Sequence, residues 1–543
     1  MDDSGERPDL SHAVGSTAVP LLEDTIDANF RRTVATWPER EALVVCHQAI
    51  RWTYAQLDER VEELAAGLLA SGLDVGDRLA LWSPNRYEWT LLQYATARIG
   101  VIMVCINPAY RTSELSFALQ QSGSRVLFAA PTFKSSDYRA MWQEVANDCP
   151  AVERAVFFES PEWNELLAMA STVAPSAVAK RSATLRNTDP INIQYTSGTT
   201  GSPKGATLSH RNILNNGFFV GETCRYTEAD RVCIPVPFYH CFGMVMGNLG
   251  CTTHGACMVI PNDGFEPGTV LEAVTRERCT SLYGVPTMFI AELAHPDFDR
   301  YDFSSLRTGI MAGAPCPAEI MKKVLDTMHM EQVTIAYGMT ETSPVSMQTV
   351  ADDPFDKRVG TVGRVHPHVE IRIIDPDTGE TVPRGTTGEF LTRGYSVMSG
   401  YWDEPAKTAQ AIDADGWMHT GDLAVMDEDG YVAITGRSKD LIIRGGENVS
   451  PREIEEFLFS HPDVVDVQVV GVPDAKNGEE VCAFVKTKSG AVDAEDIKAF
   501  CRGRIAHFKV PRYVLDIDEF PMTVTGKIQK YLLREEANSR LQL

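Results

Sequence analysis

The amino-acid sequence predicts a large α/β domain at the N-terminus, a β-rich subdomain behind it and a small α+β domain at the C-terminus. Three observations support this. Short apolar runs alternate with helical periodicity through the first half of the chain, which is typical of parallel sheets. After Gly360, turns rich in Asp, Gly and Pro separate β-like runs. The length of 543 residues also exceeds what one hydrophobic core supports, so at least two domains are expected.

The α/β region is expected to cover residues 21–437, behind a loose polar arm over residues 1–20. A capping box at Thr53 predicts the start of a helix with apolar residues at helical spacing. Residues 78–82 and 101–106 are apolar and predict buried strands, with a helical stretch between them. Further strands are predicted at residues 191–195, 231–236, 279–283 and 308–312, and the β-rich subdomain at about 360–437 contributes residues 369–374, 388–392 and 431–434.

The C-terminal α+β domain is expected over residues 438–543, about 100 residues and therefore a usual domain size. Ser450, Pro451 and Glu453 predict a helix start, with Ser as the N-cap, Pro at the first position and Glu closing a capping box. Strands are predicted at residues 464–472 and 481–486, and a helix at residues 494–505.

The composition is that of an ordinary globular protein, with 44% hydrophobic and 23% charged residues. The net charge of −24 argues against nucleic-acid binding, which needs a basic face to neutralise phosphates. It equally argues against steady adsorption to anionic lipid. If the substrates are anions, positive charge has to be concentrated at the site.

The cellular location is expected to be the cytoplasm. The twelve cysteines form no C-x-x-C pair, which indicates buried free thiols in a reducing compartment. The acidic N-terminus has no apolar core typical of a signal peptide and is a poor transit peptide. No apolar run approaches the ~18 residues of a membrane span, so no stable membrane insertion is expected.

The most specific segment is the run Y-T-S-G-T-T-G-S-P-K-G at residues 195–205, directly after an apolar strand. Glycines let the backbone approach an anion, hydroxyls donate hydrogen bonds, and Lys204 supplies a counter-charge. It differs from a Walker A sequence, which ends in Gly-Lys-Ser/Thr. A flexible polar loop is the alternative interpretation for such a composition.

This run closely resembles the signature of the adenylate-forming superfamily (ANL), which includes acyl-CoA synthetases, and the resemblance covers nearly the whole chain. It implies two stacked sheets flanked by helices in the large domain and a mobile small domain. It also implies a loop that closes over the β- and γ-phosphates of ATP. The ATP-binding residues implied there are Thr196, Ser197, Gly198, Thr199, Thr200, Gly201, Ser202, Pro203 and Lys204.

A second motif, Y-G-M-T-E-T at residues 337–342, resembles the superfamily's next core motif. By similarity, Tyr337 stacks on adenine, Thr340 bonds the α-phosphate and Glu341 holds Mg²⁺, a hard cation that prefers carboxylate oxygens. Taken alone, the motif could be an exposed turn. Further ATP-binding residues are implied at Gly313, Ala314, Pro315, Gly338, Met339 and Thr342.

Three further motifs follow in the superfamily's order. Asp422 matches the aspartate that binds both ribose hydroxyls, and Arg437 matches the arginine beside it. Lys527 matches the catalytic lysine, which reaches from the small domain to bridge the attacking carboxylate and the α-phosphate. Lys439 occupies the hinge position, where many relatives have aspartate. An exposed lysine in a glycine turn is the alternative for Lys527.

The acyl and thiol sites are less specific. Gly445, Gly446 and Glu447 match the CoA-binding face, although a plain turn explains these glycines equally well. His240 matches a catalytic-site position whose ring borders the acyl and pantetheine routes. None of residues 235–250 is acidic, which disfavours an amino-acid substrate, and the Met, Val and Gly residues there fit a flexible apolar chain or else a plain core helix.

The resemblance, strongest to the medium-chain fatty acyl-CoA synthetase branch, implies a two-step ligase that uses ATP, CoA and Mg²⁺. A carboxylate, expected to be a medium- to long-chain fatty acid, attacks ATP to give acyl-AMP and pyrophosphate, and CoA then takes the acyl group. An aryl or cinnamate-type acid–CoA ligase, a fatty acyl-AMP ligase that loads a carrier protein, and a binding protein without catalysis are the alternatives. A homodimer is one option for the oligomeric state.

Overall fold

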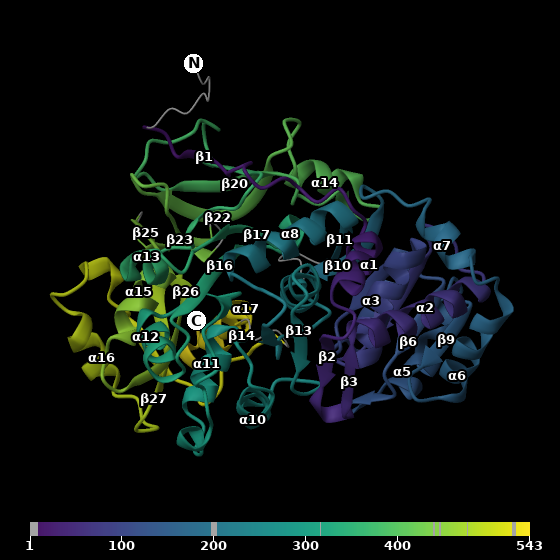
Figure 1. Ribbon diagram of the computed structural model, residues 1–543. Coiled ribbons are helices and arrows are strands. Elements are labelled where there is room, and N and C mark those ends of the chain that lie inside the picture. Colours follow the sequence, from purple (N-terminus) through teal and green to yellow (C-terminus); the bar gives the residue numbers. More distant parts are fainter. Residues whose placement is uncertain are drawn as a thin grey trace.

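The computed structural model describes residues 9–196, 203–314, 316–437, 440–444, 447–474, 476–523 and 528–543. Two large sheets carry the N-terminal part of the chain, and two smaller sheets follow (Figure 1). The first large sheet has the strand order β21 (Gly400–Tyr401), β11 (Lys204–Ser209), β10 (Pro190–Thr196), β5 (Ile102–Ile106), β4 (Arg78–Trp82), β6 (Val126–Ala129) and β9 (Arg154–Phe157).

The second large sheet has nine strands and is parallel through its centre. Parallel strands need crossover connections, and helices between successive strands supply them. The strand order is β18 (Arg364–Val365), β17 (Val345–Gln348), β16 (Gln332–Gly338), β15 (Thr308–Ala312), β14 (Ser281–Gly284), β12 (Arg231–Cys233), β13 (Cys257–Ile260), β2 (Glu41–Val45) and β3 (Ile50–Thr53).

Helices cover the faces of these sheets (Figure 1). The expected capping box is confirmed, because Thr53 and Gln56 bond each other's backbone N–H groups at the start of α2. The helices of this region are α1 (Ile26–Thr36), α2 (Tyr54–Ala70), α3 (Tyr87–Ile99), α4 (Thr112–Ser122), α5 (Tyr138–Val145), α6 (Pro161–Ala168), α7 (Ala177–Ser182), α8 (His210–Thr223), α9 (Gly250–Thr252), α10 (Pro267–Glu277), α11 (Pro286–Leu293), α12 (Ala318–Thr327) and α13 (Phe355–Gly360).

The β-rich sheet lies at the top of Figure 1, and the N-terminal arm runs along it. We expected residues 1–20 to be a loose arm, and over the described part this is wrong. His12–Val14 forms β1, which pairs with β19 in an antiparallel register, and the His12 ring lies 2.7 Å from a Glu370 oxygen. The other members are β19 (Val369–Ile374), β20 (Gly388–Gly394), β22 (Met418–Met426) and β23 (Val432–Arg437), with α14 (Pro405–Ala411) beside them.

The last sheet and its helices form the C-terminal module, drawn in yellow in Figure 1. Its helix α15 starts at Pro451 with Ser450 as the N-cap residue, as expected, but the predicted capping bond is wrong. Ser450 makes no capping bond and instead donates its hydroxyl to the Thr435 carbonyl in β23. The elements are β24 (Ile442–Arg444), β25 (Glu447–Val449), α15 (Pro451–Phe459), β26 (Val464–Asp474), β27 (Gly478–Thr487), α16 (Ala494–Cys501), β28 (Tyr513–Asp516) and α17 (Lys530–Leu541).

The large domain and the small domain have separate hydrophobic clusters. One buried cluster lies among the helices and strands around the two large sheets, and a second one joins the nine-stranded sheet to the β-rich sheet. The C-terminal module has its own two clusters, one on each side of β26 and β27. Val467 and Val469 point to one cluster and Val470 and Val472 to the other, because neighbouring side chains leave opposite faces of a strand.

Candidate functional site

The phosphate-loop motif lies at the tip of an antiparallel hairpin. Strand β10 ends at Thr196 and β11 begins at Lys204, and these two residues are directly opposite each other in the register. Residues 197–202 lie outside the described residues, so the two hairpin ends mark where the motif is anchored. Pro203, the motif residue before Lys204, is half-buried. Lys204 holds its ammonium nitrogen 5.0 Å from the centre of the Tyr401 ring.

The second motif brings its carboxylate to this hairpin. Strand β16 ends at Gly338, and residues Thr340–Thr342 form one turn of 3₁₀ helix in which all three side chains are buried. Glu341 Oε1 accepts a hydrogen bond of 3.4 Å from the Thr196 hydroxyl and one of 2.8 Å from the Tyr401 hydroxyl. The carboxylate that the sequence predicts to hold Mg²⁺ therefore lies against the first residue of the phosphate-loop motif.

The ribose aspartate forms a bridge between two other predicted site residues. Asp422 accepts 2.6 Å from the Tyr337 hydroxyl on one oxygen and 3.0 Å from Arg437 Nε on the other. Burial raises the pKa of Tyr337 well above its ordinary value and Asp422 adds to this effect, so the phenol stays a donor. Burial by itself would lower the pKa of Arg437, but Asp422 outweighs it and the pKa is raised.

Asp422 keeps capacity for a ligand despite these two bonds. A carboxylate has about four acceptor positions, and the bonds from Tyr337 and Arg437 use one on each oxygen. Strand pairing holds the arrangement, because Asp422 and Arg437 are partners in the register of β22 and β23. Phe390 packs edge-on to the Tyr337 ring, with centroids 5.2 Å apart, and fixes the ring's orientation.

The predicted adenine contacts lie at the carboxyl ends of neighbouring parallel strands. Ala312 in β15 pairs with Ala336 in β16, so Gly313, just past the end of β15, lies beside Tyr337 near the end of β16. In open α/β sheets this edge is where ligands bind. Gly313 has φ of +87°, which favours glycine, and Ala314 follows it; Pro315 lies outside the described residues.

A cavity of about 320 Å³ is lined by Tyr239, the residue before His240, and reaches Met522 and Thr523 of the C-terminal module. Its wall includes Tyr239, whose buried hydroxyl has no hydrogen-bond partner among the described residues. His240 Nδ1 accepts a hydrogen bond of 3.3 Å from the backbone N–H of Phe242, which begins a buried π-helix over Phe242–Leu249. Most of the remaining lining is apolar: Pro84, Pro108, Phe133, Pro235, Pro237, Phe265, Met288 and Met522.

The predicted catalytic lysine, Lys527, lies outside the described residues, within the segment 524–527. Both ends of this segment are described: Met522 and Ile528 form an antiparallel bridge, and Met522 and Thr523 line the 320 Å³ cavity. The segment thus starts at the wall of the large domain beside Tyr239. Lys439, Gly445 and Gly446 also lie outside the described residues, and Glu447 is exposed.

The structure adds one residue that the sequence analysis missed. Tyr401 contacts both Glu341 and Lys204, yet it is separated from Glu341 by 60 positions. No spacing rule connects residues that far apart, and Gly400-Tyr401-Trp402 carries no motif that would have marked the tyrosine. The feature that marks Tyr401 is the pairing of β21 with β11, which is visible only in the folded structure.

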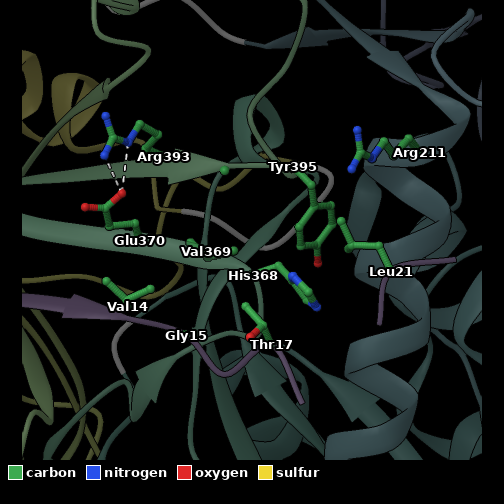
Figure 2. Close-up of a pocket in the computed structure, with 11 residues that line it drawn as sticks. Val14, Gly15, Thr17, Leu21, Arg211, His368, Val369, Glu370, Arg393 and Tyr395 are labelled. Carbon is green, nitrogen blue, oxygen red and sulfur yellow. Dashed lines mark hydrogen bonds and ion pairs between the residues drawn. The ribbon is translucent and has the colours of Figure 1, made fainter. Parts of the chain in front are cut away.

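A larger cavity, of about 510 Å³, lies away from these motifs, between the N-terminal arm and the β-rich sheet. Figure 2 shows the Arg393–Glu370 ion pair at one end and Arg211 at the other. None of the predicted site residues lines it. The 510 Å³ cavity is therefore separate from the candidate site.

The described residues contain no group of three His, Cys, Asp or Glu side chains that could hold a metal ion. A site with one protein carboxylate still fits Mg²⁺, which keeps several waters and is usually completed by substrate phosphates. Glu341 fits this chemistry, because its Oε2 makes no hydrogen bond within the described part of the chain.

Among the described residues, no helix is both long and apolar enough to cross a membrane.

Comparison with known proteins gives consistent matches along the chain. The model of the AMP-binding enzyme family matches residues 30–402, and that of the AMP-binding enzyme C-terminal domain matches residues 453–527. The chain is 49% identical to YngI of Bacillus subtilis (strain 168), a proposed acyl-CoA synthetase, over 97% of this chain and 98% of that protein. It is 43% identical to the mitochondrial medium-chain acyl-CoA ligase ACSF2 of Mus musculus, over 98% and 91%.

Solved structures show the same fold. ATP-bound MatB from Rhodopseudomonas palustris matches with a TM-score of 0.83 at 32% identity, over 95% of this chain and 99% of that one. The anthranilate CoA ligase AuaEII in complex with anthranoyl-AMP matches with a TM-score of 0.88 at 26% identity, over 97% and 99%.

Proposed function

Because the chain belongs to the family of AMP-binding enzymes, we propose that it is an AMP-forming acid–CoA ligase that activates a fatty acid. The carboxylate attacks the α-phosphorus of ATP, pyrophosphate leaves, and the thiol of CoA then displaces AMP from the acyl-AMP. One observation carries the proposal. Glu341, Thr196 and Lys204 come together at the phosphate-loop hairpin although the first is more than 130 positions from the others.

The proposed nucleotide site runs along the carboxyl ends of the strands. Tyr337, beside Gly313 and Ala314, faces adenine, and Asp422 accepts from the ribose hydroxyls with Arg437 beside it. Thr340 donates to the α-phosphate. Gly338, Met339, Thr342, Pro315, and the loop residues from Thr196 to Lys204 complete the contacts. The bridge from Asp422 to Tyr337 and Arg437 supports this assignment, since it orients a buried carboxylate before nucleotide binds.

Mg²⁺ is proposed to bind at Glu341, together with phosphate oxygens of ATP. When bound, the cation would neutralise the negative charge that shifts among the phosphate oxygens during the reaction. The chain's own contribution is to orient the carboxylate. Thr196 and Tyr401 hold one oxygen and the second is free of protein hydrogen bonds within the described ranges.

Two steps on one site suggest a small domain that moves. We assign residues 1–20 to an arm, residues 21–437 to the large domain and residues 438–543 to the small one, with Lys439 as the hinge. In the adenylation pose Lys527 bridges the carboxylate and the α-phosphate. In the thioester pose Gly445, Gly446 and Glu447 border the pantetheine arm. The position of Met522 and Thr523 in the wall of the 320 Å³ cavity supports the first pose, because these two residues come shortly before Lys527 in the chain.

The acid is proposed to be aliphatic, of medium to long chain. The mostly apolar lining of the 320 Å³ cavity beside Tyr239 supports this, and the flexible Met288 and Met522 allow for acids of different length. The relatives named medium-chain acyl-CoA ligases support it as well. An aryl acid, as in the name of the anthranilate ligase, is the second candidate. A carrier protein in place of CoA is the third. A cytoplasmic location is also proposed, supported by the free cysteines.

A coupled assay with graded acids tests the proposal. Acid-dependent ATP–pyrophosphate exchange and acyl-CoA formation are measured from butyrate to palmitate, beside benzoate and cinnamate, with CoA present or omitted. We expect the highest kcat/KM for an aliphatic acid and thioester formation only with CoA. Higher kcat/KM for benzoate or cinnamate would replace the fatty acid by an aryl acid. Release of acyl-AMP without transfer to CoA would indicate a carrier-protein acceptor, and absence of exchange with every acid would reject the ligase function.

A further inference from the structure

Tyr401 lies where the two halves of the phosphate site meet. It ends the short strand β21, which pairs with β11, so the backbone beside Lys204 sets its position. The backbone N–H of the next residue, Trp402, donates 2.7 Å to the Gly205 carbonyl and extends this contact. The Tyr401 side chain is 8% exposed. Its placement is thus determined by the same hairpin that carries the phosphate loop.

The Tyr401 side chain has one contact on each side of the site. Its hydroxyl donates 2.8 Å to Glu341 Oε1, and its ring centre lies 5.0 Å from the Lys204 ammonium. A carboxylate only accepts hydrogen bonds and a phenol carries one O–H, so the hydroxyl is the donor in this contact.

This geometry gives the two carboxylate oxygens of Glu341 different roles. Thr196 and Tyr401 both donate to Oε1, so neither competes for Oε2. A carboxylate held through one oxygen cannot rotate freely and presents its second oxygen in a fixed direction. Such outer partners are known to contribute to metal affinity in proteins. The ring also gives Lys204 a favourable face, because an ammonium is attracted to an aromatic π-system.

We propose that Tyr401 is a positioning residue that orients Glu341 toward the divalent cation of MgATP through its hydroxyl and steadies Lys204 through its ring. The proposal rests on the metal role of Glu341 proposed above. Tyr401 itself touches neither the nucleotide nor the metal in this assignment. Its hydroxyl and its ring make separable contributions, which two substitutions can distinguish.

The test measures ATP binding by the full-length protein without any acid, so that no turnover occurs. Dissociation constants for ATP are measured by calorimetry with excess MgCl₂ and, separately, with EDTA. For Tyr401→Phe we expect about a tenfold loss of affinity for MgATP, which is typical of losing one hydrogen bond to a charged group, and unchanged affinity for metal-free ATP. Tyr401→Leu should lose a further two- to fivefold, now also without metal.

Two further variants complete the design. Tyr395→Phe is the matched control, because it also removes a tyrosine hydroxyl, six positions before Tyr401. The Tyr395 hydroxyl accepts from Asn216 at 3.5 Å and does not contact Glu341. It should bind both forms of ATP as the unmodified protein does. In a Glu341→Gln background, Tyr401→Phe should cost less than twofold, because the carboxylate it orients is gone.

The outcomes separate the inference from the function on which it rests. If Glu341→Gln weakens MgATP binding and Tyr401→Phe does not, the positioning inference is overturned and the metal role stands. Equal losses for Tyr401→Phe with and without Mg²⁺ also overturn it, because they indicate a general structural effect. If Glu341→Gln leaves the effect of Mg²⁺ on ATP binding unchanged, the proposed metal role fails, and the inference about Tyr401 with it.

Discussion

Replacing Asp422 by Asn removes the negative charge at the proposed ribose site while conserving the shape of the side chain. The two hydroxyls of ribose would donate to a carboxylate that already accepts from Tyr337 and Arg437. A hydrogen bond to a charged group contributes about 1.5–3 kcal/mol, and a neutral acceptor about half of that. The amide retains one oxygen acceptor, so the loss is about 2–4 kcal/mol, or roughly 30- to 900-fold in the dissociation constant of ATP.

The same substitution also disturbs the protein side of the bridge. The new NH₂ group faces a donor, either the Tyr337 hydroxyl or Arg437 Nε, so one of those two bonds is lost as well. The assay is calorimetric titration with ATP, accompanied by thermal unfolding to verify the fold. Asp429→Asn is the control, because its exposed carboxylate lies 3.6 Å from Lys357 and away from the site. An ATP affinity within threefold of the unmodified protein, with a native melting curve, would refute the ribose assignment.

Three further predictions concern other parts of the molecule. Lys527→Ala should abolish acid-dependent ATP–pyrophosphate exchange yet still convert supplied acyl-AMP to acyl-CoA; equal loss of both activities with an intact fold would contradict the two-pose mechanism. Glu292 is fully buried without a hydrogen-bond partner for its carboxyl among the described residues, and burial raises its pKa well above the ordinary value near 4.5. The unfolded chain therefore loses this proton first, and the free energy of unfolding falls as pH rises above about 4.5, by up to ~1.4 kcal/mol per pH unit until the folded pKa is reached. Glu292→Met should remove this pH dependence of the unfolding free energy, as measured by urea titrations at several pH values. The variant should be more stable than the unmodified protein at pH 7.5 but not at pH 4.5. The same pH dependence in both proteins would show that the carboxyl is solvated. Arg98 is fully buried and bonds Asp27 at 2.6 Å, and Asp27 also accepts from Arg31 and Ser182. Arg98→Met therefore removes one of the two cations beside a buried carboxylate and should destabilise the large domain by about 3 kcal/mol, measured as a shift of the urea midpoint. A shift no larger than that of Arg186→Met, whose side chain is 79% exposed, would contradict this reasoning.

Much of the fold follows from local pattern. Residues 78–82, 308–312 and 369–374 form strands with the predicted bounds. The first two are short, mostly apolar runs, and the third alternates apolar with charged residues as a half-exposed strand does. Helix α2 begins with the predicted capping box, since both partners lie within four residues of each other. The family likewise follows from local sequence motifs, because the phosphate-loop run and the Y-G-M-T-E-T motif are each specific to it.

The wrong predictions share a different cause. Ser450 has the expected capping residue type, but its hydroxyl is taken by the Thr435 carbonyl of a neighbouring strand. The polar segment at the N-terminus lacks the apolar alternation of a strand, yet β19 offers an open edge and His12–Val14 pairs with it. Both are cases in which a partner distant in sequence outweighs local preference.

The sequence by itself determined which groups are available for chemistry: the hydroxyls and glycines of the loop, Lys204, Glu341, Asp422 and Arg437. Only the tertiary structure decided how they are held, namely Asp422 between Tyr337 and Arg437, and Glu341 against Thr196 and Tyr401. The physical reason is that a hydrogen bond is a short-range contact between atoms, whereas a sequence records only separation along the chain. Sheet topology brings the ends of distant strands to one edge, and there the pairings that orient the site are formed.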